Sequence, residues 1–509
     1  MRIACLWVPD FLLQALRRSA PELAEAPLGI AAGPLPRDVI VAVSAEAVEL
    51  GVRPGMTAAQ ARQVAPAALV RVTPPPVAAA ADEALADAAA GFSPRVKRHL
   101  PGEVLLDAGG LLPRFGREET IAHELLRACR HVGLEARVGI ASNLGVARVA
   151  ARVDEVAVVR AGEERSFMAP LPLELLQPAP ELEAMLARWG LATAGELARL
   201  PRREVGLRLG PAGVALHRLA SGEETGAFIP DPLQEVLREG VEFDDPLGLL
   251  EPFLFVANGI LARLAQRLEL RGEGFAEVLL ELRLEGAGHR EVRLKLVAPT
   301  RDVPAVLALA RLQLEAHPPG APVEGAAALV TPGRVRLAQG SLFGAPMPAP
   351  GRLSTTLARL AALVGPERVG APAVPDTHRP GVWTLAPFVL GEDRGSWIVG
   401  RGSSRPPTGS ASRTTNHEPR PTAAPVLRAF RPPREARVDA VNGRPVVVWV
   451  EALGGIVVGW AGPYRFVGEW WDDEPFARED FDVATTDGSL LRVYFDRLDR
   501  RWFVDGIYD

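Results

Sequence analysis

The sequence predicts an α+β multidomain protein, and three observations support this. The chain has 509 residues, enough for roughly three or four domains of ordinary size. Hydrophobic residues make up 48% of it and charged residues 23%, so several packed cores are possible and overall disorder is excluded. Strand-like and helix-like apolar patterns follow one another through most of the chain, in blocks that mark separate domains.

Cysteine usage and hydropathy exclude several classes of protein. The two cysteines, Cys5 and Cys129, cannot make a disulfide framework or a cysteine-based zinc site. No apolar run reaches the ~18 residues of a membrane span, and Pro9 breaks the apolar N-terminal stretch. We therefore expect no membrane contact, no signal peptide and a cytoplasmic location. The net charge of −5 does not indicate nucleic-acid binding, although a basic groove on one domain is compatible with it.

Residues 1–165 combine strands separated by helices, which predicts an α/β or α+β block. We expect Cys5 to be buried as a small apolar residue and Asp107 to cap the turn into Gly109. The periodicities predict strands at 2–8, 40–44, 103–107 and 136–141, and helices at 57–64 and 118–132.

Residues 166–232 consist of short helices joined by Gly or Pro turns. Within them, 182–200 predicts a helix, a tight turn containing Gly190, and a second helix that starts around Thr193 and Gly195. A helix-hairpin-helix of this kind directs backbone N–H groups at a DNA phosphate without reading sequence. On the local pattern alone, an ordinary αα-hairpin is the simpler interpretation.

Residues 236–337 follow a βαββαβ order, with a strong hairpin signal at Gly286-Ala-Gly-His289. Such an order gives a sheet with helices on one face, and Arg283, Arg293 and Lys295 fall on the other. This open face either follows DNA phosphates or is the solvated side of an antiparallel sheet. The predicted strands are 240–243, 276–284, 291–297 and 326–337, and the predicted helices are 246–270 and 304–317.

The last third of the chain contains a helix at 355–364 in an otherwise extended region, 351–399. Residues 400–425 are rich in Ser, Pro, Thr and Arg, cannot bury a core, and predict a disordered linker. Residues 426–509 return to alternation and predict a small antiparallel β domain, with strands at 445–451, 456–460, 481–486, 490–496 and 501–507.

Four segments, taken in order, resemble the motifs of Y-family translesion DNA polymerases. They are 4–16 (ACLWVPDFLLQAL), 41–56 (VAVSAEAVELGVRPGM), 100–110 (LPGEVLLDAGG) and 139–152 (GIASNLGVARVAAR). The resemblance covers about residues 1–335. It implies a right-hand fold, with palm and fingers at 1–165 (fingers about 12–70), a helix-hairpin-helix thumb at 166–232 and a little finger at 236–337.

The same resemblance implies that catalysis is lost. Enzymes of the family hold two divalent metal ions with three carboxylates. The corresponding positions here are Trp7, Gly102 and Glu103, and an isolated Glu cannot hold a pair of Mg²⁺ ions. We therefore expect no metal, no cofactor and no polymerase activity. A solvated or hydrogen-bonded carboxylate is the simpler role for Glu103.

The family's phosphate and sugar contacts are missing as well. Its Tyr-x-x-Arg grip on the triphosphate corresponds here to Ala45 and Val48, and the aromatic residue that excludes ribose corresponds to Leu12. Arg148 takes the place of a lysine that approaches the phosphates. Losses at separate motifs favour a polymerase fold without polymerase chemistry.

Directly after the βαββαβ block, segment 338–350 contains Gln339-Gly-Ser-Leu-Phe343. This resembles the Gln-x-x-Leu-Phe peptide by which many polymerases bind the bacterial sliding clamp, so Gln339, Ser341, Leu342 and Phe343 are clamp-binding candidates. Burying the Leu and Phe side chains in an apolar cleft is worth roughly 3–6 kcal/mol gross. The alternative is that Leu342 and Phe343 pack against their own domain.

The order of an inactivated palm, an internal clamp motif and a Trp-rich tail is similar to that of the ImuB proteins of bacterial mutasomes. That family is described as bridging the sliding clamp (the β subunit), a RecA-like ImuA-type protein and an error-prone C-family DNA polymerase. The partner contacts of the family lie C-terminal to the clamp motif. Trp470 and Trp471 are our candidates for such a contact, and their alternative place is the core of the β domain.

The resemblance implies a non-catalytic adaptor of DNA-damage-induced translesion synthesis and mutagenesis, bound to primer-template DNA and therefore nucleoid-associated. A first alternative is a working Y-family translesion polymerase whose metal ligands align differently. A second is a DNA-binding module unrelated to replication.

Overall fold

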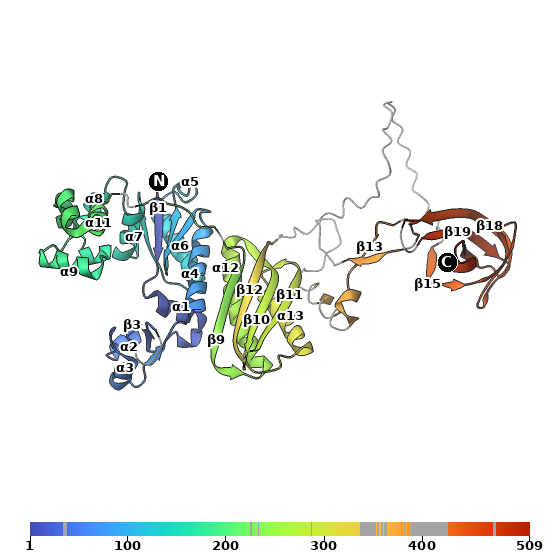
Figure 1. Ribbon diagram of the computed structural model, residues 1–509, viewed down its shortest axis with the longest axis horizontal. Coiled ribbons are helices and arrows are strands. Elements are labelled where there is room, and N and C mark those ends of the chain that lie inside the picture. Colours follow the sequence, from blue (N-terminus) through green and yellow to red (C-terminus); the bar gives the residue numbers. More distant parts are fainter. Residues whose placement is uncertain are drawn as a thin grey trace, which may run out of the picture. The chain divides into compact units, whose positions relative to one another are not determined.

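A computed structural model describes residues 1–33, 38–223, 226–232, 234–286, 288–335, 353, 356–357, 360, 364–377, 379–380, 382–386, 426–471 and 475–508. The chain divides into two compact units, Met1–Pro366 and Glu367–Asp509 (Figure 1). Among the described residues, no helix combines the length and the apolar character of a membrane span.

A five-stranded sheet forms the centre of the first unit, in the order β5-β6-β1-β7-β8. Strand β1 is central and pairs antiparallel with both β6 and β7. Alternate residues of β1 face two cores, because side chains of a strand alternate between the faces of its sheet. Helices α4 and α6 cover one face and α7 covers the other. The bounds are β1 Ile3–Trp7, β5 Val96–Leu100, β6 Glu103–Asp107, β7 Arg137–Ala141, β8 Val156–Val158, α4 Pro75–Ala90, α6 Glu118–His131 and α7 Leu144–Val153.

A small three-stranded sheet, ordered β3-β2-β4, follows the first helix of the unit. Its short helices bury a separate alanine- and valine-rich core. The elements of this part are α1 Phe11–Ser19, η1 Pro21–Leu23, β2 Leu28–Ala31, β3 Ile40–Val43, α2 Ala45–Glu49, α3 Ala58–Val64 and β4 Leu69–Arg71; α5, Leu112–Phe115, lies between β6 and α6.

Short helices pack against α7 and extend the core behind the central sheet. Helix α11 is kinked at Gly210, which has a φ of 64° and is followed by Pro211. These elements are α8 Glu164–Met168, η2 Leu173–Leu176, α9 Pro180–Arg188, α10 Ala194–Arg199 and α11 Arg202–Ala220. The two helices predicted within 182–200, with a tight turn between them, are confirmed as α9 and α10.

The predicted βαββαβ block is confirmed as a four-stranded antiparallel sheet, ordered β11-β10-β12-β9, with α12 and α13 packed on one face. The predicted start of its long helix at residue 246 is wrong. Strand β9 keeps pairing with β12 as far as Leu247, so the helix begins at Leu250. The bounds are β9 Leu237–Leu247, α12 Leu250–Arg271, β10 Glu273–Leu284, β11 Gly288–Thr300, α13 Val303–Ala316 and β12 Val323–Arg334.

The second unit contains a seven-stranded antiparallel sheet, ordered β15-β21-β20-β19-β18-β17-β16. It confirms the predicted β domain and adds β15 and β16, which the sequence did not predict. Its core gathers Val448, Phe481, Leu491 and Val504 among other apolar residues. The strands are β15 Leu427–Glu435, β16 Arg437–Val441, β17 Arg444–Val450, β18 Leu453–Gly468, β19 Phe476–Thr485, β20 Leu490–Asp496 and β21 Arg501–Tyr508. Before them come η3 Pro366–Arg368 and a two-stranded sheet, β13 Ala371–Ala373 with β14 Thr384–Ala386.

Three predictions fall on residues outside those described. They are the clamp-binding candidates Gln339, Ser341, Leu342 and Phe343, the linker at 400–425, and most of the helix at 355–364.

Candidate functional site

The three positions that correspond to metal ligands in Y-family enzymes lie together at one end of the central sheet. Trp7, the last residue of β1, pairs with Glu103, the first residue of β6, and on its other side with Arg137 of β7. Gly102 precedes Glu103, and its carbonyl accepts a hydrogen bond from the Val8 amide at 2.9 Å. Trp7, Gly102 and Glu103, which come from two of the four motifs, are thus neighbours in space.

Backbone geometry at Gly102 leaves no room for a carboxylate. Its φ of 75° lies in the left-handed region that side chains rarely adopt. A Cβ atom added there would lie 2.7 Å from the ring of Phe11. The amide of Gly102 donates to the carboxylate of Asp82 at 2.9 Å, and burial raises the pKa of Asp82. A glycine is therefore required by the turn and by the packing of Phe11.

The carboxylate of Glu103 is buried and used inside the protein. Only 1% of the residue is exposed, and its two oxygens accept hydrogen bonds from Arg148 and Arg152, one each. Burial acts to raise the pKa of Glu103, but the two guanidinium groups outweigh burial and the pKa is lowered. Glu103 thus stays ionised as the shared anion of two arginines.

The ring of Trp7 completes this cluster. The guanidinium carbon of Arg152 lies 5.1 Å from the ring centroid and that of Arg137 lies 5.6 Å from it, both within cation–π range. Arg152 also donates to the carbonyl of Arg148 at 2.7 Å. Arg152 was missed at the sequence level, although its i, i+4 spacing from Arg148 on α7 places both side chains on one helix face.

These residues do not fit a pair of divalent ions. Such ions need several carboxylate oxygens, and the side chains of Trp7 and Gly102 supply none. Both oxygens of Glu103 already face guanidinium groups. Across the described parts of the chain, no three or more His, Cys, Asp or Glu side chains are grouped so as to hold a metal. The neighbouring thiol of Cys5 is fully buried, as predicted, and burial raises its pKa.

In the helix-hairpin-helix, the amides that were expected to face a phosphate have acceptors within the protein. The amides of Ala192 and Thr193 donate to Glu196 at 2.8 and 3.0 Å, as part of a capping box at the start of α10. The amide of Gly195 donates to the carbonyl of Ala169 at 2.9 Å, and that of Gly190 donates to Ala187 at 3.0 Å. Gly190, Thr193 and Gly195 thus shape the turn and its packing, and their contact with DNA stays a prediction.

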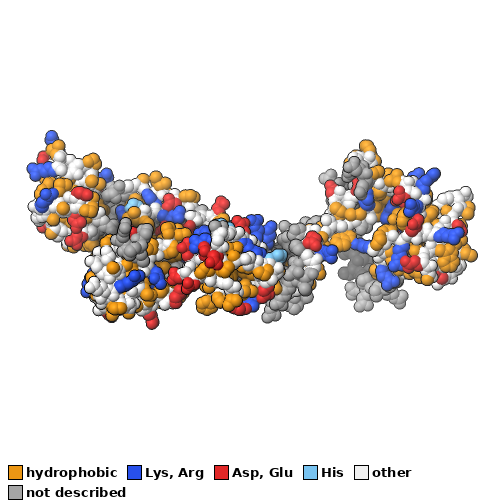
Figure 2. All heavy atoms as spheres, turned by 60° about the horizontal axis from the view of Figure 1, so that its bottom comes forward, with side chains coloured by type: hydrophobic (Ala, Val, Ile, Leu, Met, Phe, Trp, Pro, Cys, Tyr) orange, Lys and Arg blue, Asp and Glu red, His pale blue; other side chains and the backbone are white. Residues whose placement is uncertain are grey.

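The open face of the βαββαβ sheet carries the predicted cations, accompanied by carboxylates. Arg283 lies 3.2 Å from Glu242, and Arg293 lies 3.4 Å from Glu277. Lys295 is the direct cross-strand neighbour of Glu277. Acidic and basic side chains also occur side by side over the first unit in Figure 2. The placement on the open face is confirmed, but the surface is of mixed charge.

Comparison with known proteins finds relatives of this chain among Y-family DNA polymerases and ImuB proteins. Residues 6–152 match the model of the impB/mucB/samB family. Protein ImuB of Caulobacter vibrioides (strain NA1000 / CB15N) is 30% identical over 278 residues, which cover 54% of this chain and 60% of that protein. DNA polymerase IV of Caulobacter vibrioides (strain ATCC 19089 / CIP 103742 / CB 15) is 29% identical over 195 residues, 38% of this chain and 48% of that protein. This chain is a homologue of the Y-family DNA polymerases.

The match of this Y-family homologue to its curated relatives is partial. The chain spans less than two thirds of the length of the ImuB and polymerase IV proteins named above. Among solved structures, DinB from Sulfolobus solfataricus aligns with 66% of this chain and 100% of its own, at 15% identity and a TM-score of 0.39.

The second unit of the Y-family homologue exposes the tryptophan pair singled out in the sequence. Trp470 is 77% exposed and Trp471 67% exposed, and their rings meet edge to face with centroids 5.5 Å apart. They follow Glu469, whose carboxylate is held by Thr377 and by Arg379 at 3.0 Å. The alternative that this pair lies in the core of the β domain is wrong.

Three further tryptophans of this unit are exposed and were missed at the sequence level: Trp383, Trp449 and Trp460. Trp449 lies between Val448 and Val450, which both face the core, so period-two alternation within the apolar run of β17 indicates its outward position. Large exposed aromatic side chains are therefore frequent among the described residues of this unit.

Proposed function

We propose that this Y-family homologue is a non-catalytic adaptor of DNA-damage-induced translesion synthesis, which binds the sliding clamp and DNA and recruits an error-prone C-family polymerase. The observation that carries the proposal is the carboxylate of Glu103, shared between Arg148 and Arg152 where the enzymes hold metal ions. Similarity to the ImuB protein of Caulobacter vibrioides supports the adaptor role over an active polymerase.

The energetics favour attachment over catalysis. Two-metal phosphoryl transfer needs carboxylates that neutralise the metal ions beside the triphosphate and the primer end. To ligate a metal, Glu103 would have to leave its ion pairs with Arg148 and with the buried Arg152, and breaking a buried pair typically costs about 3–5 kcal/mol. Each 1.4 kcal/mol lost from transition-state stabilisation lowers a rate about tenfold.

Primer extension tests the proposal directly. The full-length protein, with a primer-template and Mg²⁺ or Mn²⁺, is expected to incorporate no template-directed nucleotide. Polymerase IV of Caulobacter vibrioides is the positive control. Template-directed synthesis that is lost in Glu103→Gln would overturn the proposal and establish the alternative, a working translesion polymerase.

Clamp attachment rests on Leu342 and Phe343, with Gln339 at the rim of the clamp's apolar cleft and Ser341 as a further contact candidate. Removing two apolar anchors worth roughly 3–6 kcal/mol gross predicts at least about a 100-fold loss of clamp affinity in Leu342→Ala/Phe343→Ala. Leu360→Ala/Val364→Ala is the matched control, because both of these side chains are apolar and exposed nearby in sequence. Equal affinity of wild type and the Leu342/Phe343 variant for the purified clamp would remove the role assigned to the motif.

The remaining partners are assigned to the second unit. A RecA-like ImuA-type protein and the C-family polymerase are the partners that the ImuB resemblance implies. The exposed pair Trp470 and Trp471 is the strongest contact candidate there, because rigid exposed aromatic rings supply most of the binding energy at many interfaces.

A further inference from the structure

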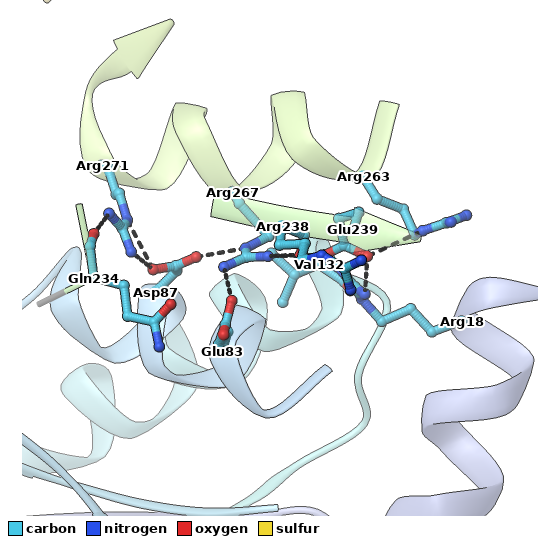
Figure 3. Close-up of polar contacts among 10 residues, drawn as sticks. All are labelled: Arg18, Glu83, Asp87, Val132, Gln234, Arg238, Glu239, Arg263, Arg267 and Arg271. Carbon is cyan, nitrogen blue, oxygen red and sulfur yellow. Dashed lines mark hydrogen bonds and ion pairs between the residues drawn. The ribbon is translucent and has the colours of Figure 1, made fainter. Parts of the chain in front are cut away.

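Seven charged side chains meet in the interior where the βαββαβ block contacts helices α1 and α4 (Figure 3). Four are arginines and three are carboxylates, and they come from α1, α4, β9 and α12. We call this cluster the α12 ion network; its members are Arg18, Glu83, Asp87, Glu239, Arg263, Arg267 and Arg271.

Arg267 of α12 is the centre of the network. It is 0% exposed and lies 2.6 Å from Asp87, 3.0 Å from Glu83 and 3.1 Å from Glu239. A further N–H donates to the carbonyl of Arg238 at 2.9 Å. Burial acts to lower the pKa of Arg267, but the carboxylates, Asp87 foremost, outweigh burial and raise it. The charged side chain of Arg267 thus has acceptors both on α4 and within the βαββαβ block.

Glu239 of β9 is the point where the first helix of the chain joins the network. Arg18 grips its carboxylate with two hydrogen bonds of 2.9 and 2.8 Å, and Arg18 also donates to the carbonyl of Val132 at 2.7 Å. From the other side, Arg263 lies 3.3 Å from the same carboxylate. Burial acts to raise the pKa of Glu239, but the nearby arginines, Arg18 foremost, outweigh burial, and the pKa is lowered.

Asp87 of α4 closes the other end. It accepts hydrogen bonds from Arg267 and from Arg271, and Arg271 also donates to the carbonyl of Gln234 at 2.8 Å. The chain that leads into the block is held as well, because the amide of Asp231 donates to the carbonyl of Val96 at 2.8 Å. The last two turns of α12 are therefore tied to α4 through Arg267 and Arg271.

Buried charges of this kind specify one arrangement of the two parts. If the block moved away from α4, Arg267 would lose both Glu83 and Asp87, and most of its compensating charge would be lost in the interior, which is strongly destabilising. Paired guanidinium–carboxylate hydrogen bonds also fix direction, since both N–H groups must meet both oxygens. A small rotation of the block would break several of these pairs together.

We propose that the α12 ion network is a lock that holds the βαββαβ block in one orientation on α1 and α4. The open sheet face is then presented to DNA preformed, with no movement of the block on binding. The fixed orientation concerns the free protein and does not depend on the adaptor role, whereas the presentation of the sheet to DNA rests on the proposed function.

Distance measurement between two spin labels tests the lock. The native Cys5 and Cys129 are both fully buried, so labels can be directed to Thr120→Cys on α6 and Gln313→Cys on α13, both exposed positions. The otherwise unmodified chain is expected to give one narrow distance distribution, unchanged by saturating primer-template DNA. A broad distribution in the free protein, or a shift when DNA binds, would overturn the proposal.

Variants show whether the network is responsible. Arg18→Met removes the hold of α1 on Glu239 but leaves Arg263 and Arg267 to neutralise that carboxylate, so the block stays folded. It is expected to broaden the distribution, and Asp87→Asn to broaden it further. Glu251→Gln, which removes an exposed ion pair with Arg311 inside the block, is the matched control and is expected to change nothing. A distribution that stays narrow in both network variants would assign the fixed orientation to apolar packing instead.

Discussion

At the residue scale, the polar groups where β1 ends and β6 begins are engaged in contacts within the protein. Trp7 offers an aromatic face to two guanidinium groups, and Gly102 offers only backbone. Glu103 keeps its charge, but its two carboxylate oxygens accept hydrogen bonds from Arg148 and Arg152. The same carboxylate that would ligate a metal in an enzyme therefore acts here as a structural anchor for α7.

Glu103→Gln is expected to lower the free energy of unfolding by about 3–5 kcal/mol, because it leaves buried Arg152 without its anion. Urea denaturation measures the loss. Glu124→Gln is the control: it breaks the ion pair with Arg127, whose side chain is largely exposed, and should cost less than about 1 kcal/mol. Equal effects of the two substitutions would show that Glu103 is not an anchor.

The same ion pairs predict a pH dependence. Because the pKa of Glu103 is lowered in the folded state, its contribution to stability is complete above its unfolded pKa of about 4.3. The contribution is lost as the pH falls through the folded-state pKa. As the pH falls below 5, the melting temperature of the wild type should therefore decrease more than that of Glu103→Gln. Thermal unfolding at a series of pH values measures both. Parallel losses in the two proteins would contradict this.

Gly102→Ala separates backbone strain from the contact with Phe11. The substitution is expected to destabilise more than Gly116→Ala, because both glycines have a similar positive φ but only Gly102 has Phe11 in the way of a Cβ atom. The comparison is made by urea denaturation. If the two variants are equally stable, then Phe11 gives way, and a carboxylate at position 102 would be tolerated.

At the scale of elements, two segments that were expected to bind a partner, the start of α10 and the turn after β18, differ in what they expose. The capping box of α10 uses Glu196 to satisfy the amides that a phosphate would need, and these hydrogen bonds lower the pKa of Glu196. At the tip between β18 and β19, Glu469 and Arg379 secure the base of the turn while Trp470 and Trp471 stay exposed. In both elements the carboxylate is hydrogen-bonded within the protein, and only the second element leaves large aromatic rings exposed.

Trp470→Ala/Trp471→Ala is expected to abolish binding of one protein partner and leave clamp binding and the melting temperature of the protein unchanged. The reason is that both rings lie outside the core. Co-purification with the ImuA-type protein and with the C-family polymerase measures the loss. Trp502→Ala is the contrasting variant. The centroid of the Trp502 ring lies 5.7 Å from that of Phe481 and 5.1 Å from that of Phe495, so removing the ring should destabilise the β domain itself. Full retention of both partners by the double variant would exclude this surface.

At the scale of the whole molecule, the proposed DNA binding has to be achieved by a chain with a net charge of −5. The basic side chains of the open sheet face have carboxylate neighbours, so binding a phosphate there means exchanging one anion for another. Affinity of this kind is modest and depends on salt.

Replacing Arg283, Arg293 and Lys295 by Ala is expected to weaken binding to primer-template DNA and to reduce the slope of log K against log salt. Each lost phosphate contact lowers the slope by about 0.9. Fluorescence anisotropy at several salt concentrations measures both effects. Arg311→Ala on the helical face is the control, since that side chain lies on α13. Binding by wild type that does not vary with salt would rule out phosphate contacts as its basis.

The sequence by itself determined the order of domains and most of the elements, because alternating and helical periodicities are local and the βαββαβ order is unambiguous. It also placed Trp7, Gly102 and Glu103 at one centre, through a resemblance to aligned motifs. Only the tertiary structure decided what those residues touch. Glu103 meets Arg152, 49 residues away, and Arg18 meets Glu239, 221 residues away. Such pairs leave no local pattern, since their energy arises only when folding removes both charges from water together.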